Sequence, residues 1–177
     1  MGKSNHIIKS IVYTALSIAM VTILTVVIRI PSVRGGYVNF GDIMIFVTAV
    51  MLGKRTGFLA GSFGSALADL LSGYPEYAIA TFIIKGIEGL LCGTIAGRRE
   101  NAPVSRLSVA AAFSALWMVA GYFLFEYTIG GYLFANKGFG ITMAVADLPG
   151  NLVQGAVCAV VAVPFILAIK KTGIKLN

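Results

Sequence analysis

The sequence is short of charge. Only 12% of its 177 residues are charged, whereas 58% are apolar, and the mean hydropathy is +0.88. A soluble domain carries about 25% charged residues, so this chain has too few to give a soluble domain a hydrated surface. The composition excludes an ordinary soluble protein and predicts one domain, residues 1–177, that lies in a lipid bilayer.

Residues that hold metals or act as nucleophiles are also scarce. The chain has one His, and its two Cys, Cys92 and Cys158, fall singly within apolar runs, which favours small buried packing residues. No H-E-x-x-H or G-x-S-x-G motif is present, and Gly53-Lys-Arg-Thr56 lacks the first glycine of a phosphate loop. The sequence therefore predicts no catalytic residue, no metal, no cofactor and no ATP-hydrolysing site.

The apolar residues gather in long runs. About 20 residues are needed to cross the hydrocarbon core of a bilayer as a helix. The predicted helices span residues 9–30, 40–52, 56–72, 77–97, 107–130 and 145–169. The second is short and would need a tilt or a locally thinner bilayer. The predicted fold class is an all-α bundle of six transmembrane helices.

The net charge of +7 is explained by topology. On one side of the predicted helices lie ten of the fourteen basic residues: Lys3, Lys9, Lys54, Arg55, Arg98, Arg99, Arg106, Lys170, Lys171 and Lys175. The other side has Arg29, Arg34 and Lys137, and Lys85 lies within the fourth helix. Basic loops stay cytoplasmic, so both termini are predicted in the cytoplasm. The basic charge therefore implies no nucleic-acid partner.

Buried ionisable and amide side chains within the predicted helices all lie in the outer half or near the midplane. Ionisable residues at such depths are costly and indicate function. Three stripes with helical spacing stand out: Tyr77, Thr81, Lys85 and Glu88; Tyr122 and Glu126; Asp147, Asn151 and Gln154. A channel or proton relay needs polar groups along its full depth. This distribution instead predicts a pocket that opens outward and ends blindly.

The outer connections are rich in glycine and aromatic residues. Their Tyr and Phe side chains fit either an interfacial belt or the walls of a ligand pocket. With them, the candidate binding residues are Asn39, Tyr74, Tyr77, Lys85, Glu88, Tyr122, Glu126, Asp147, Asn151 and Gln154. Lys85 and Glu88 also fit a structural ion pair. Asp42 and Asp69 lie nearer the interface, where solvated capping roles are favoured.

Small residues spaced four apart allow transmembrane helices to touch. The motifs Gly57-x-x-x-Gly61 and Gly89-x-x-x-Gly93-x-x-x-Gly97 favour internal packing. The pair Ala15 and Ala19 has the same spacing, in the cytoplasmic part of the first helix. This pair fits either internal packing or a docking face for another membrane subunit.

Three further motifs are Tyr37-Val-Asn-Phe-Gly-Asp42, Gly64-Ser-Ala-Leu-Ala-Asp-Leu-Leu-Ser-Gly-Tyr-Pro75 and Ile84-Lys-Gly-Ile-Glu-Gly89. Together with the Ala15 and Ala19 pair, they resemble the substrate-binding S components of energy-coupling factor (ECF) vitamin transporters. The motifs cover about a third of the chain, roughly residues 37–97.

The resemblance implies a six-helix S component in a bacterial plasma membrane. Such a protein binds a vitamin or a vitamin precursor from outside and docks on a membrane coupling subunit of the EcfT type, which works with two cytoplasmic ATPase subunits. Ala15 and Ala19 would contact the coupling subunit. The most similar subfamily is associated with hydroxymethylpyrimidine or pyridoxine. Two alternatives stay open: a stand-alone secondary transporter or channel for a small polar solute, and a membrane enzyme that uses Lys85, Glu88 or Asp147.

Overall fold

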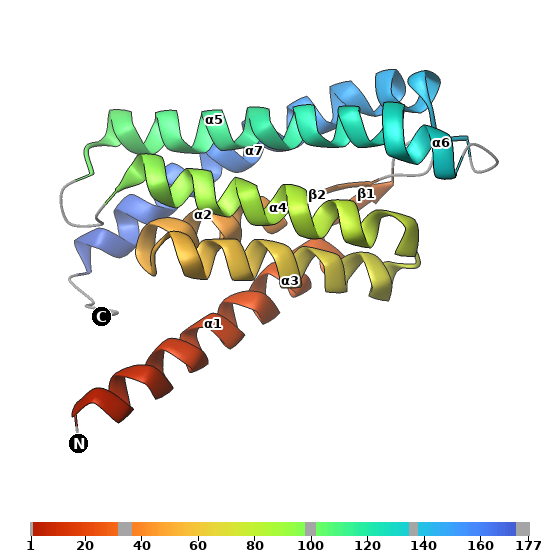
Figure 1. The fold of residues 1–177 in the computed structure, drawn as a ribbon. Coiled ribbons are helices and arrows are strands. Elements are labelled where there is room, and N and C mark those ends of the chain that lie inside the picture. The colour runs from red at the N-terminus through yellow and green to blue at the C-terminus, as the bar shows by residue number, and fades with distance from the viewer. Residues whose placement is uncertain (1, 32–36, 98–101, 135–137, 173–177) are drawn as a thin grey trace.

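A computed structural model describes residues 2–31, 37–97, 102–134 and 138–172. Its elements are α1 (Gly2–Val27), β1 (Arg29–Pro31), β2 (Tyr37–Asn39), α2 (Gly41–Met51), α3 (Lys54–Ser72), α4 (Pro75–Ala96), α5 (Val104–Phe125), the π-helix η2 (Glu126–Gly130), α6 (Gly131–Leu133) and α7 (Ile141–Lys171). The helices lie along one another in a bundle (Figure 1).

Each predicted run falls mainly on one of these helices, but the run 107–130 continues from α5 through η2, and the run 9–30 extends past α1 into β1. Among the described residues, four segments are able to cross a membrane by length and composition: Ile7–Val27, Pro75–Ala96, Val104–Leu133 and Ile141–Lys171. Helix α2 is apolar but has only 11 residues, and α3 is less apolar than the others. The chain is therefore an all-α membrane protein.

A small hairpin was not predicted. Strands β1 and β2 pair antiparallel, with Arg29 opposite Asn39 and Pro31 opposite Tyr37. The hairpin, α6 and the turn between α3 and α4 lie at one end of the bundle, called here the hairpin end (Figure 1). The start of α1 and the end of α7 lie at the opposite end, called the terminal end.

Glycines let α3 and α4 lie side by side (Figure 1). A Cβ atom at Gly61 would lie 2.2 Å from the backbone oxygen of Lys85, and one at Gly89 would lie 2.3 Å from the backbone oxygen of Gly57. Because neither position has room for a side chain, the two helices are packed backbone against backbone. The predicted internal packing is confirmed for Gly57, Gly61, Gly89 and Gly93, whereas Gly97 is exposed at the end of α4.

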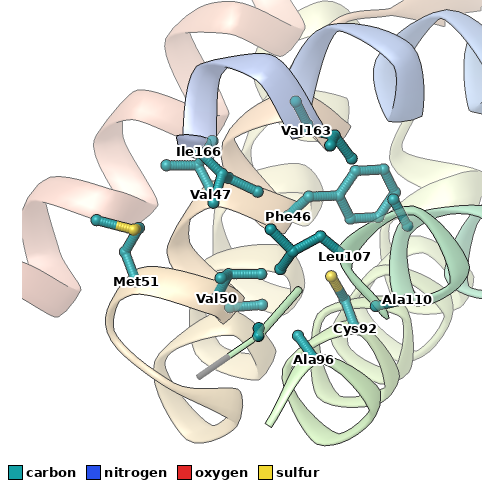
Figure 2. Packing of buried hydrophobic residues seen from close by; sticks show 14 of the residues in the cluster. Phe46, Val47, Val50, Met51, Cys92, Ala96, Leu107, Ala110, Val163 and Ile166 are labelled. Carbon is teal, nitrogen blue, oxygen red and sulfur yellow. The ribbon is translucent and has the colours of Figure 1, made fainter. Parts of the chain in front are cut away.

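The terminal end is filled by apolar side chains from α2, α4, α5 and α7, several of which Figure 2 shows in contact. This apolar cluster consists of Phe46, Val47, Ala49, Val50, Met51, Cys92, Ala96, Ala102, Leu107, Ala110, Ala111, Ala115, Cys158, Ala162, Val163 and Ile166. Both cysteines are buried and free, as predicted. The many alanines bring the helices close together, and the buried polar side chains described among them are the hydroxyls of Thr48 and Ser114.

Helix α1 diverges from the other helices toward the terminal end (Figure 1). Ala15 and Ala19 are both exposed, and so are the neighbouring Leu16 and Met20. Internal packing, one of the two interpretations of the alanine pair, is therefore wrong. The pair lies on a free apolar face of α1.

Candidate binding pocket

A cavity lies at the hairpin end, between the hairpin and helices α3, α4, α5 and α7. It is lined by Thr25, Tyr37, Val38, Asn39, Ser65, Asp69, Tyr77, Thr81, Lys85, Tyr122, Glu126, Asp147, Gly150, Asn151 and Gln154. The cavity volume is about 50 Å³. One water molecule needs roughly 10–15 Å³, so the pocket in this state holds only a few waters.

Most of the predicted binding residues meet in this cavity. Eight of the ten line it: Asn39, Tyr77, Lys85, Tyr122, Glu126, Asp147, Asn151 and Gln154. Tyr74 and Glu88 are not among the lining residues. The ring of Tyr74 packs on that of Tyr37, with centroids 5.1 Å apart, and Glu88 lies behind Lys85.

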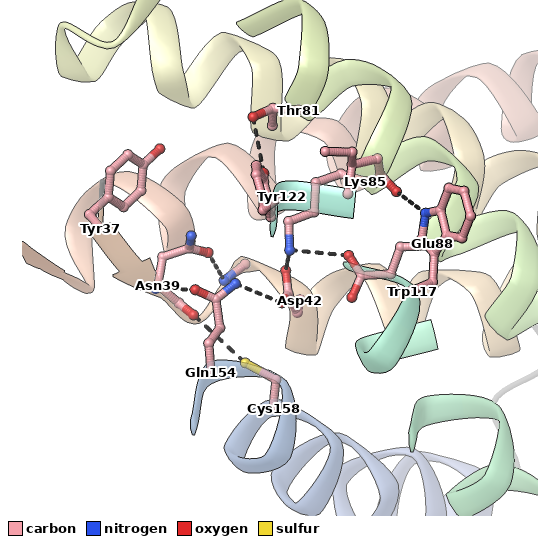
Figure 3. A network of polar contacts seen from close by, with 12 residues as sticks. Tyr37, Asn39, Asp42, Thr81, Lys85, Glu88, Trp117, Tyr122, Gln154 and Cys158 are labelled. Carbon is pink, nitrogen blue, oxygen red and sulfur yellow. Dashed lines mark hydrogen bonds and ion pairs between the residues drawn. The ribbon is translucent and has the colours of Figure 1, made fainter. Parts of the chain in front are cut away.

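Lys85 forms the floor of the pocket with two carboxyl groups. Its ammonium contacts Asp42 and also lies 3.1 Å from a carboxylate oxygen of Glu88 (Figure 3). Lys85 therefore belongs both to a structural ion pair and to the pocket wall. The solvated capping role expected for Asp42 is wrong, because the side chain is fully buried beneath Lys85 and α7.

Gln154 joins three elements at this floor. Its side-chain oxygen accepts a hydrogen bond from the backbone N–H of Asn39 at 2.9 Å, and its amide donates to Asp42 Oδ2 at 2.8 Å. The Asn39 side-chain oxygen in turn accepts from the backbone N–H of Gly41 at 2.9 Å. Strand β2, α2 and α7 are thereby held together by amide groups (Figure 3).

Asp69 and Tyr37 form a second polar contact, at the side of the pocket. The Tyr37 hydroxyl donates to Asp69 Oδ1 at 2.5 Å. Burial and the adjacent Asp69 carboxyl raise the pKa of the Tyr37 phenol above its usual range, so the phenol stays protonated and donates. Asp69 is only 4% exposed, so the solvated role expected for it is also wrong.

Tyr37 was missed at the level of sequence. The signal that could have found it is its place two residues before Asn39, because alternate residues of a strand face the same side. The strand itself is only three residues long. Thr25 and Ser65 carry no such signal, since small hydroxyl residues are common throughout apolar helices.

Aromatic rings close the pocket toward the hairpin end. Tyr77 lies 5.2 Å from Phe139 and 5.6 Å from Phe125, ring centroid to ring centroid. Tyr77 and Phe139 are buried, whereas Tyr132 is 88% exposed and Tyr127 is 52% exposed. Of the aromatic residues in the outer connections, Tyr37 lines the cavity, Phe139 is buried against Tyr77, and Tyr132 is exposed like a residue of an interfacial belt.

Glu126 is positioned by an irregular turn. It begins the π-helix η2, and its backbone oxygen accepts from the Gly140 N–H at 3.0 Å, at the start of α7. Its carboxylate Oε1 accepts from the Tyr77 hydroxyl at 3.2 Å. Because π-turns are rare and concentrate at functional sites, this turn marks the Glu126 end of the pocket.

The comparisons with known proteins cover nearly the whole chain. Residues 5–171 match the family described as the S component of ECF-type riboflavin transporters. A Pyrococcus woesei protein described as an uncharacterized protein in gap 3'region is 38% identical over 76% of this chain and 83% of its own length. The thiamine precursor transporter HmpT of Lactococcus lactis is 31% identical over 92% of this chain and 86% of its own. The chain therefore belongs to the S components of ECF-type riboflavin transporters, a family of transport proteins and not of enzymes.

Proposed function

We propose that this chain binds a small vitamin or vitamin precursor, hydroxymethylpyrimidine or pyridoxine, in the pocket at the hairpin end. It delivers this substrate inward only when docked on an ATP-driven coupling module. The observation that carries the proposal is that the polar pocket ends on the Lys85 floor and is followed by the apolar cluster.

The blind end argues against a channel. A permeation pathway requires polar groups or water along its length. Along the segments of α2, α4, α5 and α7 that carry the apolar cluster, the buried polar side chains among the described residues are the small hydroxyls of Thr48 and Ser114, and none is acidic, basic or an amide. This favours a binding subunit over the alternative of a stand-alone transporter or channel.

The size of the cavity bears on the substrate. With about 50 Å³ available, a single heteroaromatic ring needs less rearrangement of the pocket than the fused rings of a flavin. One relative that aligns over most of both chains is named as a transporter of a thiamine precursor. We therefore favour a one-ring substrate, although the family as a whole is described by riboflavin.

The proposed topology has six crossings, with both termini on the cytoplasmic side of the plasma membrane. It is supported by the common position of the start of α1 and the end of α7 (Figure 1). Lys54 and Arg55 begin α3 at that end, and Lys170 and Lys171 end α7 there. The basic residues Arg34, Arg98, Arg99, Lys137 and Lys175 lie outside the described residues.

The proposed partners are a membrane coupling subunit of the EcfT type and two cytoplasmic ATPases. The exposed Ala15 and Ala19 face is the proposed contact with the coupling subunit. Replacing both alanines by Trp should leave ligand affinity unchanged within about twofold, since neither residue lines the pocket, and should abolish uptake in cells that contain the module. Val160→Trp, on the exposed face of α7, is the matched control and should retain uptake.

Binding itself is tested by calorimetry on the purified full-length protein, without ATP or partners. We expect one site and a submicromolar dissociation constant, about −8 kcal/mol or more favourable, for a one-ring vitamin or precursor. A panel of B vitamins and their precursors in which nothing binds would rule the proposed function out.

A further inference from the structure

Among the charged side chains of the pocket lining, acidic ones outnumber basic ones. The chain has seven Asp and Glu residues, and five line the pocket or touch its floor: Asp42, Asp69, Glu88, Glu126 and Asp147. Lys85 is the one basic residue in the lining, and its ammonium already lies between two carboxyl groups. An anionic ligand would therefore meet several carboxyl groups and, among the described lining residues, no cation free to pair with it.

Two of these carboxyl groups each present an oxygen that lacks a donor. Asp69 Oδ2 and Glu126 Oε2 are buried and accept no hydrogen bond from any described residue, although the other oxygen of each group accepts one from a tyrosine. Both residues line the cavity and are at most 4% exposed. Buried polar groups are normally paired. The two oxygens are therefore acceptors that are available to a donor on a ligand.

The acceptors share the cavity with two tyrosine rings, and the Lys85 ammonium lies 5.6 Å from the centroid of one of them, Tyr122. The rings of Tyr77 and Tyr122 line the cavity with centroids 6.4 Å apart. Asp147 lies against Glu126 and adds a further carboxyl group at that end. Tyrosine faces attract planar rings and, more strongly, positively charged ones.

Resting on the proposed function, we infer that the pocket selects a planar ring that carries N–H donors, such as an aminopyrimidine or its protonated form, and rejects anionic ligands. The amino edge of the ring donates to Glu126 and Asp69, while the ring lies against Tyr77 and Tyr122. Carboxylate acceptors form stronger hydrogen bonds than neutral ones. A phosphate or carboxylate on the ligand would be repelled, so the transported form is unphosphorylated.

The ligand side of this inference is tested with three probes of one ring size. These are hydroxymethylpyrimidine, the analogue in which hydrogen replaces its ring amino group, and its phosphate ester. Calorimetry on the full-length protein in lipid nanodiscs should show the amino-free analogue roughly 10- to 150-fold weaker. The phosphate ester should be at least roughly 100-fold weaker, because like charges face one another.

The protein side is tested with Glu126→Gln, which keeps the size of the side chain and replaces its carboxyl group by an amide. Because the variant replaces the proposed carboxyl acceptor of the amino group, the affinity for hydroxymethylpyrimidine should fall roughly 10-fold or more, and the affinity for the amino-free analogue should change by less than about threefold. Glu76→Gln is the matched control, since Glu76 is acidic and lies at the same end without lining the pocket. The single Trp117, whose indole N–H donates to the Ile84 backbone oxygen at 3.1 Å, reports by fluorescence that the α4 and α5 packing is kept.

The outcomes separate this inference from the proposed function. Equal binding of the amino-free analogue, tight binding of the phosphate ester, or no effect of Glu126→Gln would overturn the inference and leave a vitamin-binding subunit. Submicromolar binding of riboflavin without binding of any aminopyrimidine would do the same. Absence of binding by every vitamin and precursor would overturn the proposed function.

Discussion

The two ends of this bundle differ in the side chains that they bury. At the hairpin end, carboxyl, amide, ammonium and phenol groups surround a cavity, and two buried carboxylate oxygens lack a donor. At the terminal end, helices α2, α4, α5 and α7 pack Ala, Val, Ile, Leu and Phe, and the buried polar side chains described among them are the small hydroxyls of Thr48 and Ser114. The polar groups that line the cavity and the apolar packing therefore lie in different halves of the bundle.

The polar end is stable only as a network. A lysine buried beside two carboxyl groups is favourable when all three are present, but removal of one leaves charge without compensation in a dry environment. The apolar end has no such dependence, because its packing energy is spread over many small contacts. Changes at the two ends should therefore differ in size and in what they affect.

The largest effect is expected for Lys85→Met. This change leaves Asp42 and Glu88 buried without their cation, and the free energy of unfolding should fall by roughly 3–5 kcal/mol, measured by chemical unfolding in detergent. Lys171→Met, at an exposed residue, is the control and should change little. Adding Asp42→Asn and Glu88→Gln to Lys85→Met should recover much of the loss. A single variant as stable as the parent would show that the floor is not a coupled network.

A smaller loss is expected where glycine holds α3 against α4. Gly61→Ala drives a methyl group into the Lys85 backbone oxygen, which cannot move independently of its helix. The expected destabilisation is about 1–3 kcal/mol, read from thermal unfolding. Gly121→Ala meets only the Ile84 side chain at 3.0 Å and should be milder. If the two variants unfold at the same temperature, the backbone contact is not what limits the approach of the helices.

Gln154→Leu removes the amide bridge made by Gln154 but keeps the ion pair of Lys85. It removes the partners of the Asn39 N–H and of Asp42 Oδ2, which should lower stability by roughly 1–3 kcal/mol. Asn151→Leu is the control, because Asn151 lies three residues before Gln154 on the same pocket wall and its side chain makes no hydrogen bond to a described residue. Thermal unfolding of both variants should show the larger shift for Gln154→Leu, and the reverse order would contradict the bridge.

The smallest effect on stability is expected for a change within the apolar cluster. Ile166→Val trims one methyl group from the apolar cluster and should lower stability by roughly 0.5–1.5 kcal/mol. Ligand affinity should stay within about twofold, because Ile166 does not line the pocket. Calorimetry and thermal unfolding on the same sample check both halves of this expectation, and a marked loss of affinity would show that the two ends are not separate.

Much of the fold was predictable because the bilayer restricts the choices. Long apolar runs located every main helix, and glycine spacing located the α3 and α4 contact. The hairpin was missed, since strands of three residues leave no alternation to detect. The π-turn at Glu126 was missed as well, because its geometry depends on the contact between Glu126 and Gly140 rather than on local sequence.

The pocket was predicted in part, for a related reason. A charged or amide side chain in a long apolar run, such as Lys85 or Gln154, can be recognised from the sequence as buried. Asp42 and Asp69 sit near helix ends, where sequence cannot tell whether a hairpin or another helix covers them, and both proved buried. Tyr74 and Glu88 share the spacing of pocket residues but have nearer partners, Tyr37 and Lys85.

The central claim is that this chain binds its substrate and cannot pass it across a membrane alone. The most direct measurement places the purified protein, without partners, in liposomes with radiolabelled hydroxymethylpyrimidine. The account predicts that bound label saturates at about one molecule per protein molecule and does not depend on the internal volume of the liposomes. Label that accumulates in proportion to that volume would contradict it.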